Sequence, residues 1–134
     1  MWTGPRNGTV IYLDTHVVVW LYAGETDLFP ENVRQMIDES EQVLVSPLVL
    51  LELQYLKEIN RLTVEPSLIF EYLAETIGLR LCDLSLERVT IEALTLNWTR
   101  DPFDRIITAA AAARNAPLIT KDTIIREHYA NACW

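Results

Sequence analysis

Four short runs of β-branched and other apolar residues punctuate the chain, and each is followed by a segment of helical character. The runs cover residues 9–14 (TVIYLD), 42–46 (QVLVS), 79–84 (LRLCDL) and 118–120 (LIT). Short apolar runs of this kind are typical of strands buried on both faces, and strands that alternate with helices form mostly parallel sheets. The sequence therefore predicts an α/β fold, a three-layer α/β/α sandwich around a central, mostly parallel sheet.

Helix-start signals fall between these runs. A residue that can cap a helix precedes proline at Ser46 and at Asp101, and Glu65 precedes proline in the same way, while Ser85 and Asp122 are further candidate caps. The predicted helices cover residues 15–22, 31–40, 66–78, 86–96 and 102–115, with another from residue 47 and a short one after residue 122, and residues 132–133 are a candidate edge strand.

Length and composition indicate one domain. The chain has 134 residues, half of them apolar, which is enough for an ordinary globular core. We expect residues 1–8 to be a flexible lead-in and residues 9–134 to form a single domain. The longest apolar runs are too short to span a bilayer, and two cysteines, Cys82 and Cys133, are too few for a disulfide scaffold. A reduced, cytoplasmic protein is expected.

Four acidic residues fall where the predicted fold brings segments together. Asp14 closes the first predicted strand, and Asp122 lies just beyond the strand at 118–120. The carboxyl ends of parallel strands meet at one edge of a sheet, where open α/β proteins bind ligands. Glu52 lies inside its predicted helix among apolar neighbours, and Asp104 borders the apolar stripe of its own helix. A carboxylate in such a setting is unfavourable unless it is paired or bound to a metal ion.

Each acid also has an ordinary structural explanation. Asp101, before proline, is a typical helix N-cap, and Asp104 can complement a positive helix N-terminus. Asp122 can cap the last helix, and Glu52 can pair with a buried arginine. Four carboxylates gathered without cations would repel one another, however, and a hard divalent cation with oxygen ligands removes that repulsion. Because paired His or Cys ligands are missing from the sequence, Mg²⁺ or Mn²⁺ is favoured over Zn²⁺.

Four motifs, in this order, resemble those of the PIN-domain ribonucleases, specifically the VapC toxins of prokaryotic toxin-antitoxin modules. They are DTHVVVW from residue 14, SPLVLLEL from residue 46, RDPFDRIITAAA from residue 100 and PLITKD from residue 117. The resemblance covers nearly the whole chain from residue 10 and implies a PIN-like fold. It matches four residues to the family's acidic quartet, which binds one or two Mg²⁺ or Mn²⁺ ions: Asp14, Glu52, Asp104 and Asp122. Asp101 is then a cap, with an outer-shell role left open.

The chemistry implied by the resemblance is metal-assisted hydrolysis of RNA phosphodiester bonds. A bound ion lowers the pKa of a coordinated water and neutralises charge on the phosphoryl oxygens, so the protein's task is mostly placement. Asp14 and Asp104 are the first-choice direct ligands, and Glu52 and Asp122 complete the shell directly or through water. Products with a 5′-phosphate and a 3′-hydroxyl are expected.

The same resemblance implies a protein partner. A small VapB-like antitoxin would wrap the domain with its C-terminal segment and place a basic side chain in the acidic site, and the formal net charge of −8 suits such a partner. Residues 47–79 are richer in large apolar side chains than a thin domain of this size easily hides. A hydrophobic surface in that region predicts a homodimer.

The negative charge also limits how RNA can be held, because it disfavours a broad basic binding surface. Four basic residues lie close to the acidic motifs and are candidate contacts for RNA phosphates: Arg100, Arg105, Lys121 and Arg126. The alternative for Arg105 is an ion pair with Asp101, four residues earlier on the same helix.

Five further residues have weaker claims to function. The Thr15 hydroxyl can contact a metal-bound water, but capping of the next helix is the favoured interpretation. His16 is a conceivable general base, although a hydrogen-bonded structural role is favoured. Thr120 either orients a ligand or ends its strand. Trp20 and Trp98 can stack on bases, but packing in the core or at an interface is the preferred interpretation.

Two other classes of protein fit parts of the pattern. One is a catalytically inactive PIN-fold interaction module. A protein without catalytic activity would have no physical reason to keep four mutually repelling acids. The other is a phosphorylated receiver domain with Asp83 as phosphoacceptor. The first predicted strand lacks the paired acids of such domains, and Glu52 would have no purpose in one.

Overall fold

The computed structural model of the protein describes residues 8–134, so the predicted lead-in lies outside the described residues except for Gly8. Five strands form one sheet in the order β3-β2-β1-β4-β5, and every neighbouring pair is parallel. The strands are β1 (Val10–Leu13), β2 (Gln42–Val45), β3 (Leu79–Leu81), β4 (Leu118–Ile119) and β5 (Ala132–Cys133). The predicted parallel sheet is confirmed, and the candidate edge strand at 132–133 is its fifth member.

Seven α-helices and one short 3₁₀ helix connect the described strands. They are α1 (Thr15–Ala23), η1 (Thr26–Leu28), α2 (Glu31–Glu39), α3 (Pro47–Glu58), α4 (Pro66–Ile77), α5 (Leu86–Ala93), α6 (Pro102–Ala113) and α7 (Thr123–His128). Proline begins α3, α4 and α6, where its missing N–H would have no helical partner anyway. Gly24 and Gly78 end α1 and α4 with positive φ angles of 75° and 72°, a conformation that glycine adopts without strain.

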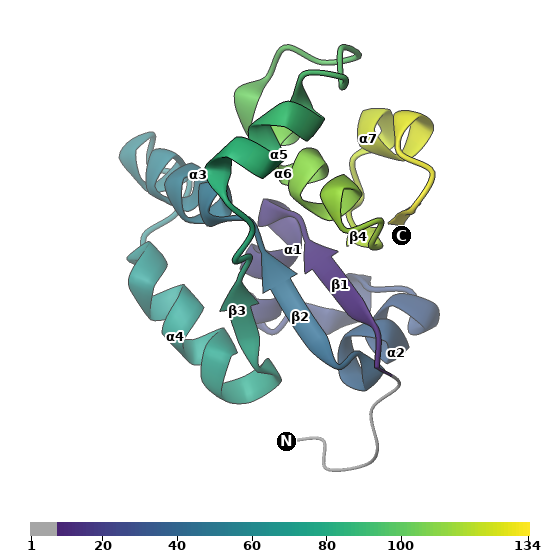
Figure 1. The fold of residues 1–134 in the computed structure, drawn as a ribbon. Coiled ribbons are helices and arrows are strands. Elements are labelled where there is room, and N and C mark those ends of the chain that lie inside the picture. The colour runs from purple at the N-terminus through teal and green to yellow at the C-terminus, as the bar shows by residue number, and fades with distance from the viewer. Residues whose placement is uncertain (1–7) are drawn as a thin grey trace.

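The direction of the connections places helices on both faces of the sheet. From β1 to β3 the chain moves toward one edge, and from β3 to β5 it crosses to the other. Because parallel crossovers are right-handed, this reversal puts α1 to α4 on one face and α5 to α7 on the opposite face. In Figure 1, α1 and α2 lie behind the sheet and α6 lies on the near side. The three-layer α/β/α sandwich is confirmed.

Two predicted elements end three residues earlier than expected. β3 stops at Leu81 instead of residue 84, because its only neighbour, β2, ends where Ser46 caps α3, and the Cys82 N–H makes the last bond to the Val45 carbonyl. α5 stops at Ala93 instead of residue 96. The chain then turns toward α6, and the Arg105 guanidinium binds the carbonyls at the helix end.

The core is centred on β1, which has neighbours on both sides. Ile11, Tyr12 and Leu13 are each at most 1% exposed. On α6 the alanines 109–111 are fully buried, and their small side chains let this helix lie close to its neighbours. The strand order reverses direction between β1 and β4, which is where open α/β sheets have their ligand crevice.

Candidate metal and active site

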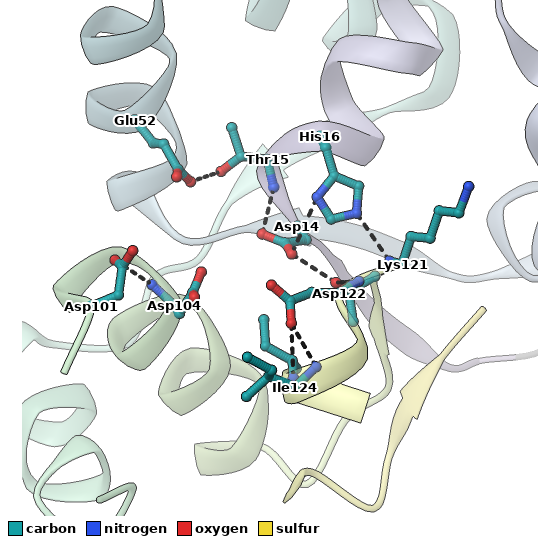
Figure 2. Close-up of polar contacts among 11 residues, drawn as sticks. Asp14, Thr15, His16, Glu52, Asp101, Asp104, Lys121, Asp122 and Ile124 are labelled. Carbon is teal, nitrogen blue, oxygen red and sulfur yellow. Dashed lines mark hydrogen bonds and ion pairs between the residues drawn. The ribbon is translucent and has the colours of Figure 1, made fainter. Parts of the chain in front are cut away.

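A hollow of about 310 Å³ opens at the carboxyl ends of β1 and β4. Its lining includes all four acids of the sequence-predicted quartet, and these come from four different elements: Asp14 after β1, Glu52 from α3, Asp104 from α6 and Asp122 before α7. Figure 2 shows the four carboxylates around a common gap. The fold therefore brings together the residues that the sequence singled out, across the length of the chain.

Asp14 is the most rigidly held of the four. It is 3% exposed and serves as the N-cap of α1, with its Oδ1 accepting a hydrogen bond of 2.8 Å from the Thr15 N–H. Its Oδ2 accepts a 2.7 Å bond from the buried Thr120 hydroxyl, and His16 Nδ1 lies 3.5 Å from the same oxygen. These contacts hold the carboxylate in one orientation.

Thr120 also joins Asp14 to Asp122. The Thr120 hydroxyl donates to Asp14 and accepts a 3.0 Å bond from the Asp122 N–H. Asp122 in turn caps α7, with its Oδ1 accepting from the N–H groups of Ile124 and Ile125 at 2.9 and 3.0 Å. Capping and membership of the acidic hollow are thus compatible for this residue.

Glu52 is held by a side chain from the neighbouring helix. The Thr15 hydroxyl donates a 2.5 Å hydrogen bond to Glu52 Oε1. Burial raises the pKa of the Glu52 carboxyl, the Thr15 bond partly offsets this, and the charges of Asp14 and Asp101 raise it further. Two sequence-based interpretations are wrong here. Thr15, for which capping was the favoured role, does not cap α1, because Asp14 does, and the partner of Glu52 is a hydroxyl and not an arginine.

Asp104 has the most perturbed carboxyl group of the hollow. Burial raises its pKa to about 7, and the charges of Asp101, Asp14, Asp122 and Glu52 all push in the same direction. Within residues 8–134, its carboxylate makes no hydrogen bond and no ion pair. It is a half-buried acid surrounded by other acids, without a cation that would stabilise its charged form.

Asp101 has the capping role that the sequence favoured for it. Its Oδ1 accepts bonds from the N–H groups of Phe103 at 2.8 Å and Asp104 at 3.3 Å, and the side chain is exposed. It does not line the hollow, although its charge contributes to the raised pKa values of Glu52 and Asp104.

The four candidate RNA contacts differ in how they are engaged. Arg105 does not pair with Asp101; its guanidinium donates to the carbonyls of Ala93 at 2.8 Å, Leu94 at 3.4 Å and Thr99 at 3.5 Å, so it joins α6 to the end of α5. Its predicted contact with RNA phosphates stays a prediction, because these bonds do not test it. The other three are exposed: Arg100, Lys121 and Arg126.

The donor set fits a hard divalent cation, because all four acids offer carboxylate oxygens and two of them have raised pKa values caused by burial and mutual repulsion. With the side chains as they stand, no three His, Cys, Asp or Glu residues in the described part of the chain are grouped closely enough to hold an ion. Side chains such as that of Asp104, whose carboxylate makes no hydrogen bond, would have to rotate before the carboxylates could bind one ion together.

Several contacts of the site were not visible in the sequence. The Thr15 to Glu52 bond and the ring of His16, which lies between Asp14 and the Lys121 N–H, join segments 37 and 105 residues apart. The one available signal was position, since Thr15 and His16 directly follow an acid at a strand end.

None of the helices in the described residues is long and apolar enough to cross a membrane.

Comparison with known proteins finds similar proteins over nearly the whole chain. A PIN domain family model matches residues 11–131. Ribonuclease VapC22 of Mycobacterium tuberculosis is 29% identical over 125 residues, covering 90% of this chain and 92% of that protein. Among solved structures, the VapBC2 complex of Rickettsia felis bound to a promoter DNA fragment has a similar chain, with a TM-score of 0.67, 20% identity, and coverage of 92% and 96%. A toxin-antitoxin complex from Klebsiella pneumoniae has a TM-score of 0.64 at 16% identity, with the same coverage.

Proposed function

Because this chain belongs to the PIN domain family, we propose that it is an endoribonuclease of the VapC type, which hydrolyses RNA phosphodiester bonds and is inhibited by a cognate antitoxin. Residues 9–134 would form its single nuclease domain. The observation that carries the proposal is the acidic hollow, in which carboxylates from four elements meet at the strand-order reversal. The likeness to Ribonuclease VapC22, which spans nearly the whole of both chains, supports the choice of RNA as substrate.

The four acids of the hollow would hold Mg²⁺ or Mn²⁺. Such an ion lowers the pKa of a coordinated water and neutralises charge on the phosphoryl oxygens. Asp14, fixed by Thr120, and Asp104, whose carboxylate is unbonded, are the first-choice ligands. Glu52 and Asp122 complete the set, each with one oxygen already accepting a hydrogen bond from the protein and the other available.

The remaining polar residues would serve the acids and the substrate. Thr15 and Thr120 orient Glu52 and Asp14, and Asp101 adds negative charge from outside the hollow. Arg100, Lys121 and Arg126, which are exposed, are the proposed contacts for RNA phosphates. Arg105 would be a weaker candidate for such a contact, because its guanidinium already donates to the carbonyl of Ala93.

Protein partners are proposed from exposed apolar side chains and from charge. Large hydrophobic residues on α3, at its C-cap and on α4 are between 41% and 55% exposed: Leu51, Tyr55, Ile59, Leu68 and Tyr72. Such a surface suits a homodimer or the apolar part of a VapB-like antitoxin. The net charge of −8 suits an antitoxin segment that carries basic side chains. Both structural neighbours are toxin-antitoxin complexes, which supports this assignment.

The test is cleavage of a panel of total RNA and tRNA by antitoxin-free protein, with Mg²⁺, Mn²⁺ or EDTA. Wild type should cut RNA only with metal, and Asp14→Ala and Asp104→Asn should not cut it. Asp101→Asn is the matched control, because asparagine also caps helices and the site keeps its four acids. If wild type is inert and binds no Mn²⁺ by calorimetry, the nuclease proposal fails and the chain is an inactive PIN-fold interaction module.

A further inference from the structure

A second hollow of about 440 Å³ adjoins the acidic one. It is lined by His16, Trp20, Lys121, Asp122, Thr123 and Ile124. Three of these residues, His16, Trp20 and Asp122, also line the acidic hollow, so the two depressions share a wall. The second hollow is therefore adjacent to the acids, and only residues common to both hollows separate them.

Among the residues that the structure describes, Lys121 is the only lysine or arginine that lines either of these two hollows. Its backbone is fixed, because its N–H donates a 3.0 Å bond to His16 Nε2. Its side chain is exposed and makes no ion pair or hydrogen bond within residues 8–134. In Figure 2 it extends on the side of His16 away from Glu52 and Asp104. The Lys121 ammonium thus lies near the acids without forming an ion pair with any of them.

Trp20 provides a fixed aromatic ring in the same place. It is half-buried and packs against His16, Trp134 and Phe29, with ring centroids 5.0, 5.6 and 6.4 Å away. The Lys121 ammonium lies 5.8 Å from the Trp20 centroid, near the outer limit of a cation–π contact. A flexible exposed lysine can leave that contact easily, while the tryptophan is held by three neighbouring rings.

A cation and an aromatic ring side by side recognise a nucleotide whose base is unpaired. The ammonium binds the phosphate, and any base can stack on an indole, which is how single-stranded nucleic acids are commonly held. A paired base would not be available for stacking. In a chain with a net charge of −8, a local cation of this kind also gives RNA a place to bind near the acids.

We propose that this second hollow is a nucleotide subsite for single-stranded RNA, in which Lys121 binds a phosphate next to the one that is cut and Trp20 stacks on the adjoining base. The inference rests on the proposed function for its substrate class. It makes Lys121 and Trp20 determinants of binding and of the strand's path, and gives neither a part in the chemistry.

The test is the affinity for a short fluorescent single-stranded RNA of mixed sequence, measured by anisotropy over a range of salt concentrations. All proteins carry Asp104→Asn, which removes one proposed metal ligand and so prevents turnover. Lys121→Met should weaken binding about threefold to tenfold and reduce the salt-dependence slope by about one. Lys57→Met, which removes the same charge from the last turn of α3, where Lys57 pairs with Glu65 outside both hollows, is the control and should leave both values unchanged.

The contribution of the ring is tested with a conservative pair. Trp20→Leu should weaken binding without changing the salt slope, and Trp20→Phe should restore most of it, since phenylalanine still stacks. Thermal melting shows whether each variant is folded, and the exposed Lys121 keeps the test decisive if Trp20→Leu is not. Equal affinities for Lys121→Met and Lys57→Met would overturn the subsite proposal, and the hollow would then be a candidate contact surface for a protein partner.

Cleavage by the protein with intact acids, measured separately with Mg²⁺, distinguishes the two proposals. A protein that never cuts RNA but loses affinity on Lys121→Met keeps the subsite and loses the nuclease assignment. A protein that cuts RNA while Lys121→Met binds normally keeps the nuclease assignment and loses the subsite.

Discussion

The hydroxyl of Thr120 donates a 2.7 Å hydrogen bond to the carboxylate of Asp14, 106 residues earlier in the chain. Both residues are buried, at 0% and 3% exposure, and the same hydroxyl accepts the Asp122 N–H at 3.0 Å. One oxygen atom therefore sets the relative positions of two of the four acids, one after β1 and one after β4.

Replacing Thr120 with valine should damage both activity and stability. Valine has the same shape without the hydroxyl, so Asp14 loses a donor and the Asp122 N–H loses its acceptor. We expect ribonuclease activity to fall about 10- to 100-fold and the free energy of unfolding to fall by about 1–3 kcal/mol. Cleavage rates and urea denaturation measure the two effects. Thr120→Ser keeps the hydroxyl and should retain most of both; equal losses in the two variants would contradict the role assigned to the hydroxyl.

The stability of the metal-free protein should fall as pH rises. The folded-state pKa of Asp104 is raised to about 7 from an ordinary value of 3.8, and that of Glu52 is raised as well, so the folded protein binds these protons more tightly than the unfolded chain. The resulting stability is fully present below the ordinary value and is lost as pH rises through about 7. Allowing for solvent screening, the Asp104 contribution is on the order of 1–3 kcal/mol.

Thermal melting in EDTA at several pH values checks this dependence. The melting temperature should decrease from mildly acid to mildly alkaline pH, and added Mn²⁺ should restore it at the alkaline end, because a ligand bound only by the folded state stabilises that state. A metal-free melting temperature that rises through neutral pH would show that the acids do not repel one another as described.

Asparagine at position 104 should make the metal-free protein more stable at alkaline pH while abolishing cleavage. The amide keeps the size of the side chain but removes the charge that burial and four neighbouring acids disfavour. Asp101→Asn is the comparison, since it preserves the cap of α6 and should leave cleavage close to wild type. The two variants are compared by melting in EDTA at alkaline pH and by RNA cleavage with Mg²⁺; a stabilised Asp104→Asn that still cuts RNA would remove Asp104 from the metal site.

His16 should prove to be a positioning residue. Its Nε2 accepts the Lys121 N–H, so the neutral ring carries its proton on Nδ1, which faces Asp14 Oδ2 at 3.5 Å. A ring engaged on both sides has no free nitrogen to take a proton from water. His16→Asn keeps a donor near the Nδ1 position and should retain more activity than His16→Ala. A general base contributes about 10²- to 10⁴-fold, so equal losses of that size in both variants, measured as kcat, would indicate proton transfer.

The sequence was informative wherever a local rule decides the outcome. Strand positions followed from β-branched runs between turns, and helix starts from Ser46 and Asp101 before proline. The grouping of Asp14 and Asp122 followed from the geometry of parallel strands, whose carboxyl ends share an edge. Glu52 and Asp104 were predicted to belong to the site because each is an acid among apolar neighbours on its helix.

Tertiary contacts decided what the sequence could not show. The end of β3 depended on where its neighbour β2 stops, and the end of α5 on an arginine from another helix. The hydroxyl of Thr15 bonded a glutamate on α3, while Asp14 occupied the N-cap position of α1 and accepted the N–H of Thr15 itself. Such pairings are set by the packing of helices, and a single sequence carries no local signal for them.

The position of β4 between β1 and β5 also has a consequence for biosynthesis. Asp14 is synthesised early, and its partner Thr120 is synthesised only after α1 to α6. A growing chain therefore contains Asp14 before it contains the residues of β4 that complete the hollow. Until β4 joins the sheet, Asp14 lacks its Thr120 donor and Asp122 is not in place. For a chain proposed to cut RNA, this order of assembly delays competence until residues 118–122 have been made and β4 has joined the sheet.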